Sequence, residues 1–283
     1  MKNYLIINEF CQMESFEKVY NKLKTAFSKK GEKLEILTNV QARALLNRQS
    51  NGEPILFWDK DVNLAKLLEK CGYRLINSAF TIETCDDKAK TYIALKGKVA
   101  QPKTILAPFV YDNYQYTNTD FLNAIGEELG YPLIIKENKG SFGAQVYLVN
   151  DIEELEKLVI GFCHSDFLFQ EFLSSSSGKD VRVYVVGDEV VAYALRYNDR
   201  DFRSNVNSGG KMKKIENIDK RYLDTAILVA KELRADFAGV DLLISDNGPI
   251  VCEVNSNAHF NALSEVCEVD IAEKIVEYYL SLK

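Results

Sequence analysis

Two apolar segments near the end of the chain each carry an acidic residue where a buried strand would carry an apolar one. Residues 239–244 and 250–255 are rich in β-branched side chains, and the Asp-Asn-Gly sequence between them predicts an antiparallel hairpin. With a turn centred on Asn247, Asp241 in the first strand lies directly opposite Glu253 in the second. Two carboxylates are therefore expected to face each other on one side of the sheet.

Like charges that face each other across a sheet are destabilising, so a compensating charge is expected. Asn255 follows Glu253 by two residues and shares its face, because side chains repeat every second residue along a strand. Two carboxylates and an amide oxygen suit a hard divalent cation such as Mg²⁺, which keeps water and substrate phosphates in its other positions. From the hairpin alone, a metal site and an exposed face with ordinary surface charges are equally open.

A second stretch that can do chemistry begins where an apolar run, residues 131–136, ends in a lysine. Lys136 is followed closely by a flexible Gly-Ser-Phe-Gly turn at residues 140–143, and then by a second predicted strand over residues 145–149. Backbone N–H groups of such a turn can surround phosphate oxygens while the ammonium group neutralises their charge. A plain hairpin with a solvated lysine is the competing interpretation, and the turn taken alone favours it.

Other polar side chains interrupt apolar segments further along. Gln170 and Glu171 lie within a predicted strand, residues 167–173. Arg182 alternates with valines in the next predicted strand, so it faces away from their apolar side. The polar loop of residues 198–210 is long for a compact domain, and such loops are more often functional than idle.

The first 80 or so residues alternate between strand and helix patterns, which predicts a small parallel α/β domain. Its predicted elements are a first strand within residues 1–10, helices 14–30, 40–47 and 62–71, and strands 34–37, 55–58 and 73–77. No Gly-x-Gly-x-x-Gly sequence follows the first strand, so a Rossmann dinucleotide site is not supported. The domain is expected to end around residues 80–87.

The rest of the chain mixes hairpins with helices. Predicted helices cover residues 88–95, 121–130, 151–162, 222–233 and 270–282. Predicted strands, besides those already described, cover residues 104–106, 180–186 and 190–196.

Composition argues against several classes of protein. The chain has 283 residues, 47% hydrophobic and 27% charged, the profile of an ordinary globular protein with material for about two domains. A net charge of −6 and the lack of a basic arm argue against nucleic-acid binding. The six cysteines are scattered without a Cys-x-x-Cys pair. The N-terminus is too polar for a signal peptide and no apolar run could span a membrane, so a cytoplasmic protein is expected.

The order of the motifs is more specific than any one of them. Strand-Lys with Gly-Ser-x-Gly, then Gln-Glu-Phe, Asp-x-Arg, Asp-Phe-Arg-Ser-Asn, Gly-Val-Asp and Glu-Val-Asn resembles the ATP-grasp superfamily, most closely its RimK-like branch of carboxylate–amine (glutamate) ligases. The resemblance covers about residues 85–283. It implies a combined α/β and α+β fold, with a parallel α/β domain at residues 1–83 and two α+β subdomains that clasp ATP at residues 84–167 and 168–283.

The resemblance also implies roles for individual residues. Lysines and two loops contact the nucleotide phosphates, a hinge after a strand holds the adenine, and an acidic residue contacts the nucleotide at the ribose. The corresponding residues are Lys136, Lys88, Ser141, Gly143, Arg203, Ser204 and Asn205 for the phosphates, Gln170, Glu171, Phe172 and Leu173 for the hinge, and Asp180 for the ribose. Asp241, Glu253 and Asn255 match the family's magnesium ligands, with two ions expected and Mn²⁺ as an alternative metal.

The implied chemistry has two steps. A substrate carboxylate attacks the γ-phosphate of ATP to form an acyl phosphate, and an amine then displaces phosphate to form an amide. Arg182, Arg196 and Arg203 are the predicted catalytic residues, because a guanidinium group binds carboxylate or phosphate through two hydrogen bonds. Arg203 is expected to stabilise charge on the carbonyl oxygen. The expected partners are ATP, a carboxylate, and glutamate or another amino acid as the amine, and a homo-oligomer stays open.

Two other functions stay open from the sequence: a phosphotransferase that stops after γ-phosphoryl transfer, and a nucleotide-binding module without turnover.

Two departures from the family pattern concern the site itself. Gln145 stands where many relatives have another glycine, and residues 256–261, Ser-Asn-Ala-His-Phe-Asn, stand where relatives tend to have Ser-Pro-Gly. His259 in this segment could contact substrate, carry a proton or serve as a structural loop residue.

Overall fold

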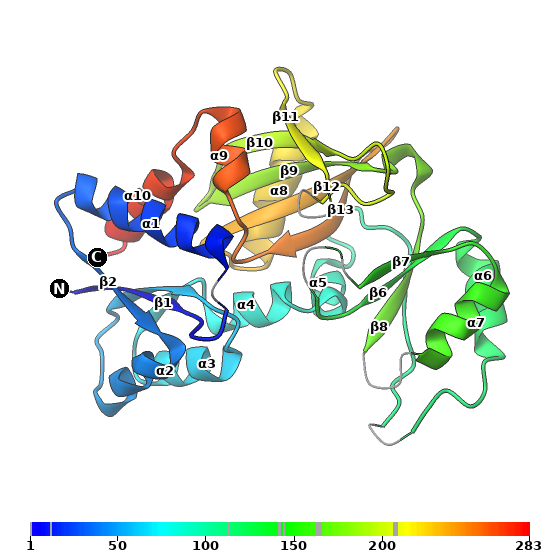
Figure 1. Cartoon of the computed structure of the whole chain (residues 1–283), viewed down its shortest axis with the longest axis horizontal. Helices are drawn as coiled ribbons and strands as arrows, with labels where there is room; N and C mark the ends of the chain where they lie inside the picture. The colour runs from blue at the N-terminus through cyan, green and yellow to red at the C-terminus, as the bar shows by residue number, and fades with distance from the viewer. Residues whose placement is uncertain are drawn as a thin grey trace.

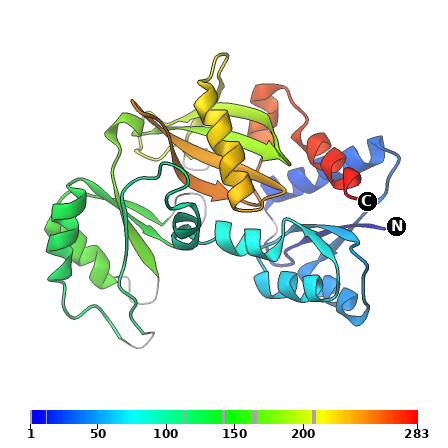
Figure 2. The same ribbon diagram turned by 180° about the vertical axis from the view of Figure 1, so that it is seen from behind.

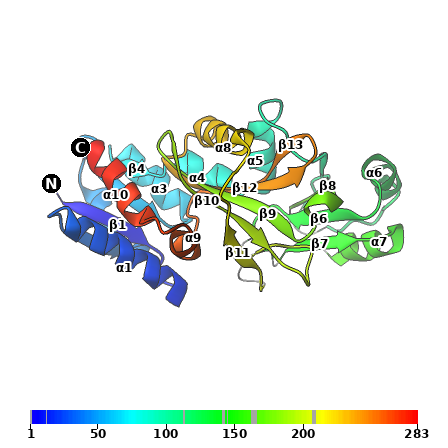
Figure 3. The same ribbon diagram turned by 90° about the horizontal axis from the view of Figure 1, so that it is seen from above.

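A computed structural model describes residues 2–11, 13–111, 114–140, 143, 145–161, 166–205 and 209–283. The described residues form three β-sheets, one of five strands and two of four. The five-stranded sheet of the C-terminal region lies in the middle of an elongated molecule, with the N-terminal sheet at one end and the remaining sheet at the other (Figures 1 and 3).

The N-terminal sheet confirms the predicted parallel arrangement, with strand order β2-β1-β3-β4. Its strands are nearly continuous apolar runs because helices cover both faces: Leu5 packs in one core with the first helix, and Ile6 in another with the third. The elements are β1 (Asn3–Ile7), α1 (Glu14–Lys29), β2 (Leu34–Thr38), α2 (Asn39–Ala42), η1 (Arg43–Asn47), β3 (Pro54–Trp58), α3 (Val62–Lys70), β4 (Arg74–Ile76) and α4 (Ala79–Cys85).

The sheet at the opposite end is antiparallel, in the order β5-β8-β6-β7. Two amphipathic helices bury their apolar stripes on one side of it, which gives this part of the chain a core of its own. The elements, after α5 (Lys88–Leu95), are β5 (Thr104–Leu106), α6 (Phe121–Leu129), β6 (Leu133–Glu137), β7 (Val146–Val149), α7 (Ile152–Gly161) and β8 (Phe167–Glu171).

The middle sheet is antiparallel, in the order β11-β10-β9-β12-β13. Helix α8 packs across one face, as Figure 2 shows, and α9 and α10 pack near the other together with α1. The elements are η2 (Ser174–Ser176), β9 (Lys179–Val186), β10 (Glu189–Tyr197), β11 (Lys211–Lys214), α8 (Lys220–Glu232), β12 (Phe237–Ser245), β13 (Gly248–Asn255), α9 (Asn261–Cys267) and α10 (Ile271–Ser281).

The N-terminal and middle sheets share one hydrophobic core. Trp58 at the end of β3 stacks on Phe237 at the start of β12, with ring centroids 5.2 Å apart. The fully buried Asn77 side chain donates to the carbonyls of Phe237 and Ser256, at 2.9 and 2.8 Å, and accepts from the N–H groups of Asp236 and Phe237. These two sheets therefore form one packed unit, while the division of the chain at residues 83 and 167 stays a prediction.

The structure also contains elements that the sequence patterns did not predict. Helix α4 occupies the stretch expected to be a domain boundary, and the Ser78 side chain caps it by accepting from the Thr81 N–H. Strand β11 and helix α9 were likewise unpredicted, because the first consists mostly of lysines and the second is short. None of the described helices is long and apolar enough to cross a membrane.

Candidate active site

The C-terminal hairpin has the predicted pairing, with Asp241 opposite Glu253 and Gly239 opposite Asn255. It reaches that register in an unexpected way. Ser245 pairs with Gly248, so the turn has only two central residues, and a β-bulge between Asp241 and Leu242 then restores the pairing. The two carboxylates consequently lie on the same face of the sheet.

That face carries an ion-pair network across three adjacent strands. Arg182 on β9 lies opposite Asp241, and its Nε and Nη2 donate to the two carboxylate oxygens, the latter at 2.8 Å. Arg196 on β10 donates from Nη2 to Asp241 at 2.9 Å and forms a two-bond pair with Asp180, with both bonds at 2.7 Å. The Ser204 hydroxyl also donates to Asp180. Every charged group of this network is almost completely buried except Arg182, whose side chain is 11% exposed.

The network shifts the pKa values of Asp241 and Arg196. Burial alone would raise the pKa of Asp241, but the guanidinium groups of Arg182 and Arg196 lower it below its ordinary value. Burial opposes the charge on Arg196, but the carboxylates of Asp180 and Asp241 raise its pKa above its ordinary value. The site therefore holds fixed positive and negative charges near neutral pH.

A narrow cleft of about 100 Å³ lies between the middle sheet and the β5-β8-β6-β7 sheet. It brings together most of the residues predicted to bind the nucleotide, together with three from the ion-pair network and hairpin. These residues are Lys88, Lys136, Gly143, Gln170, Glu171, Phe172, Leu173, Asp180, Arg203, Ser204 and Asn205, with Arg196, Asp241 and Glu253. Ser141, also predicted to bind phosphate, lies outside the described residues.

Lys136 is buried in this cleft at the end of β6. Its Nζ donates to Gln170 Oε1 on the neighbouring strand at 2.7 Å and lies 3.5 Å from Cys252 Sγ at the bulge of the hairpin. The ammonium group thus stands between the two sheets that form the cleft. Lys88 Nζ lies 3.5 Å from the carbonyl of Gly140, at the start of the predicted phosphate loop.

The strand that leads to the predicted hinge is paired on both sides. Strand β8 lies between β5 and β6, and Glu171 Oε1 accepts from the Lys103 N–H at 2.6 Å. Phe172 and Leu173 follow where the strand ends, and Phe172 contacts Phe202 edge-on at 6.4 Å. Apolar rings therefore line one side of the cleft beside backbone groups that have left the sheet.

The loop after β10 closes against the predicted phosphate loop. Arg203 is held by Asp201, with Nη2 2.7 Å from Oδ2, and its Nη1 donates to the Gly143 carbonyl at 2.8 Å. Gly143 adopts a positive φ of 73°, and an added Cβ would lie 3.1 Å from Asn205 Oδ1. Arg203 thus joins the two loops, and its charge is partly compensated by Asp201.

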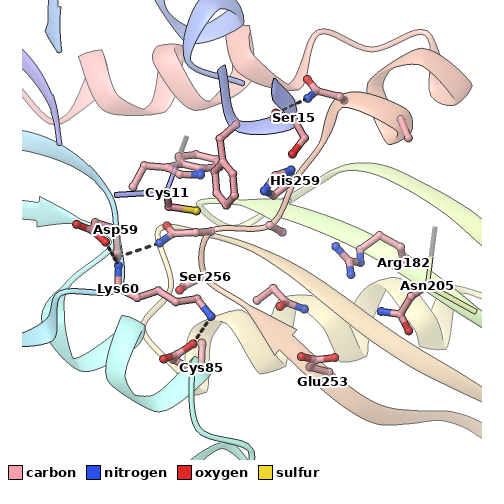
Figure 4. Close-up of a pocket in the computed structure, with 18 of the residues that line it drawn as sticks. Cys11, Ser15, Asp59, Lys60, Cys85, Arg182, Asn205, Glu253, Ser256 and His259 are labelled. Carbon is pink, nitrogen blue, oxygen red and sulfur yellow. Dashed lines mark hydrogen bonds and ion pairs between the residues drawn. The ribbon is translucent and has the colours of Figure 1, made fainter. Parts of the chain in front are cut away.

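A larger cavity of about 410 Å³ opens between the N-terminal and middle sheets (Figure 4). Arg182 and Asn255 line this cavity and not the narrow cleft. Arg196, Asn205 and Glu253 line both, so the cleft and the cavity meet at these side chains. A nucleotide in the cleft would present its terminal phosphate to molecules in the cavity.

His259 lies in the wall of this cavity, where Figure 4 shows it near Arg182. It packs edge-on against Phe16, with ring centroids 4.3 Å apart. Burial, reinforced by the charge of Arg182, lowers the pKa of His259 to about 4. The imidazole is therefore neutral near pH 7, which fits a packing or substrate-contact role better than a proton-carrying one.

The N-terminal domain contributes a wall that the sequence motifs did not reveal. Its residues that line the cavity are Asn8, Cys11, Ser15, Phe16, Tyr20, Trp58, Asp59 and Lys60. The signal that could have found Asn8 and Asp59 is their position directly after the first and third parallel strands, since ligands bind at the carboxyl ends of such strands.

The donor set on the hairpin fits a hard divalent cation. It offers only oxygens, from the carboxylates of Asp241 and Glu253 and the amide of Asn255. Within the described ranges no group of three or more His, Cys, Asp and Glu side chains could hold a metal, so the proposed donor set depends on the amide oxygen of Asn255. Both oxygens of Asp241 are engaged by arginines, so this carboxylate would share its charge between them and the ion.

Lys136→Met should raise the KM for ATP about 10- to 100-fold, because a charged hydrogen bond to a phosphate contributes about 1.5–3 kcal/mol. Methionine fills nearly the same volume, so the fold should persist. Initial rates against ATP concentration and nucleotide binding by calorimetry would measure the change. Lys139→Met, at an exposed position of the same loop, is the matched control and should leave the KM unchanged. An unaltered KM in the Lys136 variant would show that Lys136 does not bind the nucleotide phosphates.

Comparisons with known proteins agree with this geometry. Residues 85–279 match the family model described as a RimK-like ATP-grasp domain. The human N-acetylaspartylglutamate synthase A is 36% identical over 230 residues, which cover 79% of this chain and 56% of that protein. The chain thus spans little more than half the length of this curated relative.

Solved structures share the fold over nearly the whole chain. A RimK domain ATP-grasp protein from Sphaerobacter thermophilus superposes with a TM-score of 0.71 at 19% identity, covering 98% of this chain and 99% of that one. The D-alanine–D-alanine ligase of Bacillus anthracis complexed with ATP has a TM-score of 0.77 at 17% identity, covering 100% and 97%. The expected ATP-grasp fold, preceded by a parallel α/β domain, is confirmed.

Proposed function

The chain belongs to the RimK-like ATP-grasp family, and from this premise we propose that it joins a carboxylate to an amine at the expense of ATP. The observation that carries the proposal is the shared wall of Arg196, Asn205 and Glu253 between the narrow cleft and the larger cavity. ATP occupies the cleft, the two other substrates occupy the cavity, and the transferred phosphoryl group passes between them at this wall. The human relative's name points to glutamate as the first amine to test.

In the first step the substrate carboxylate attacks the γ-phosphate, and an acyl phosphate and ADP form. Catalysis of such a transfer consists mostly of positioning and electrostatic stabilisation. Lys136 and Lys88 hold the phosphates, and Arg203 keeps the loop after β10 closed on them. Asp241, Glu253 and Asn255 would hold Mg²⁺, which we propose as two ions replaceable by Mn²⁺ and which would neutralise the charge of the phosphates.

In the second step the amine attacks the acyl carbon, and phosphate leaves as the amide forms. Negative charge develops on the carbonyl oxygen, and a fixed cation in a dry site stabilises it without reorganisation. We propose Arg203 for this role, assisted by Arg182 and Arg196, whose guanidinium groups are held in place by Asp241 and Asp180.

The test is release of ADP and phosphate with pairs of carboxylates and amines, followed by mass spectrometry of the products. A ligase requires both partners together and gives a product that has lost one water relative to the two substrates. A stable phosphorylated product formed without any amine would instead assign the chain as a phosphotransferase. Nucleotide binding without turnover for any pair would leave only a binding module and would reject the proposal.

A further inference from the structure

The N-terminal sheet contains a point at which the order of its strands reverses. The chain places β2 on one side of β1 and β3 on the other. In open parallel sheets, ligands bind outside the carboxyl ends of the strands at such a switch point. Asn8 directly follows β1 and Asp59 directly follows β3, and Asn8 Nδ2 donates to Asp59 Oδ1 at 2.9 Å. Both residues line the larger cavity, so this crevice opens into the proposed substrate site.

Asp59 is an uncompensated carboxyl group. It is only 5% exposed, yet it forms no ion pair with any described residue. The backbone N–H groups of Lys60, at 2.6 Å from Oδ1, and of Asp61 donate to the Asp59 carboxylate, but the ammonium group of Lys60 pairs with Asp86 instead. Oδ2 has no hydrogen-bond partner in the described part of the chain. Burying a carboxylate without a cation is costly, so a positively charged ligand group would stabilise the ionised form of Asp59.

Other polar atoms in the wall of the larger cavity also lack a hydrogen-bond donor. Asn257, from the segment after β13, donates from Nδ2 to the Asp59 carbonyl at 3.1 Å, while its own Oδ1 is buried and unpartnered. Asn261 Oδ1 is in the same condition, and Trp58 Nε1 is the corresponding donor among the described lining residues. Acceptors thus outnumber donors among the unsatisfied atoms, and they come from both packed sheets.

The cations of the cavity do not offset this deficit. Figure 4 shows Arg182 on the side of the cavity opposite Asp59 and Lys60. Arg182 and Arg196 are already paired with Asp241 and Asp180. The end of the cavity formed by the N-terminal domain therefore favours a ligand group that is positively charged and rich in N–H donors.

We propose that the crevice formed by Asn8, Asp59 and Asn257 binds the ammonium group of a substrate, which is an α-amino acid or another primary amine. The inference rests on the proposed function only in taking the larger cavity as the substrate site. In the empty protein, burial raises the pKa of Asp59. An ammonium group at this point supplies the charge that keeps the carboxylate ionised.

Binding without turnover tests the inference. Each standard amino acid, and ethylamine as a minimal probe, is titrated into the protein saturated with Mg²⁺ and ADP, so that the metal site is already filled. The N-acetylated counterpart of each probe lacks the ammonium charge. At least one amine should bind about 10-fold more tightly than its N-acetylated form, and Asp59→Asn should abolish that difference. Preference for no amine over its acetylated form, or a preference that survives in Asp59→Asn, overturns the inference.

Thermal unfolding of the empty protein separates binding from a structural role. Asp59→Asn keeps an acceptor for Asn8 and removes the uncompensated charge, so its Tm should equal or exceed that of the wild type. Asp86→Asn, the same change in the same cavity, breaks the ion pair with Lys60 and should not raise the Tm. A Tm clearly lowered by Asp59→Asn would assign the residue to structure alone.

Turnover then identifies which substrate carries the ammonium group. A raised KM for the amine in Asp59→Asn assigns the group to the amine substrate, and a raised KM for the carboxylate assigns it to that partner. Both results support the inference, whereas two unchanged KM values contradict it. If no pair of substrates is ligated, the proposed function fails, but the binding result still stands as a test of the crevice.

Discussion

Glu253→Gln should lower turnover roughly 10²–10³-fold while the protein stays folded, which is the usual loss when one fixed electrostatic group is removed from a transition state. Glu253 is only partly buried, has no ion pair within the described chain, and lines both the cleft and the cavity. Glutamine preserves its shape and removes its charge. Steady-state rates at saturating ATP, with circular dichroism and Tm as controls for folding, measure the effect.

The same variant should weaken the response to the metal. The Mg²⁺ concentration for half-maximal activity should rise, while binding of ADP in the absence of Mg²⁺ should be unchanged. Glu265→Gln, at an exposed position on α9, serves as the matched control and should behave like the wild type. Near-wild-type activity of Glu253→Gln would show that the hairpin does not hold the metal.

Asp241→Asn should destabilise the empty protein by about 3–5 kcal/mol, the usual cost of removing one partner of a buried ion pair. Two buried guanidinium groups, those of Arg182 and Arg196, would lose the carboxylate between them. If Asp241 served only as a metal ligand, the opposite result would follow, because its removal would relieve repulsion with Glu253 across the strands. Urea unfolding without nucleotide or metal therefore distinguishes the two roles by sign.

The loss of stability at acid pH provides a second measure of the interaction between Asp241 and its arginine partners. Because the pKa of Asp241 is lower in the folded protein than in the unfolded chain, its stabilising contribution is present above about pH 4 and is lost as the pH falls further. The wild type should lose stability over that interval, and Asp241→Asn should lack this component. Asp224→Asn, in an exposed pair with Lys220, should change neither the stability nor its pH dependence.

Local patterns predicted the acidic hairpin correctly, although two errors cancelled in its register. The prediction placed the turn at Asn247 and assumed regular pairing, whereas the structure has a two-residue turn and a bulge after Asp241. Either feature alone would have moved Asp241 out of register with Glu253. The number of residues between two strands does not reveal a bulge, because the extra residue is accommodated by backbone geometry and not by side-chain type.

Contacts between distant segments could not be predicted in this way. Arg182 was predicted only to face away from the apolar side of its strand, and its partner Asp241, 59 residues away, follows from β9 and β12 being neighbours in the sheet. Asp180, expected at the ribose, pairs with Arg196 and Ser204 while still lining the cleft. The order of strands in the sheet determines the partners of Arg182 and Asp180, and strand patterns in the sequence do not reveal that order.

The residues at the substrate end of the site were even harder to predict from the sequence, because only the sheet topology brings them together. Asn8 and Asp59 are ordinary polar residues in the sequence, and they become neighbours only when β3 pairs with β1. The nucleotide cleft was more predictable, because its residues come in short motifs whose order along the chain resembles a known family.

The core shared by the N-terminal and middle sheets also limits how such proteins can diversify. Exchange of the first 80 or so residues between two relatives would have to reproduce the Trp58–Phe237 stack and the four hydrogen bonds of Asn77. Chimaeras made by swapping this segment whole should lose stability wherever the incoming segment lacks the ring of Trp58 or the side-chain amide of Asn77.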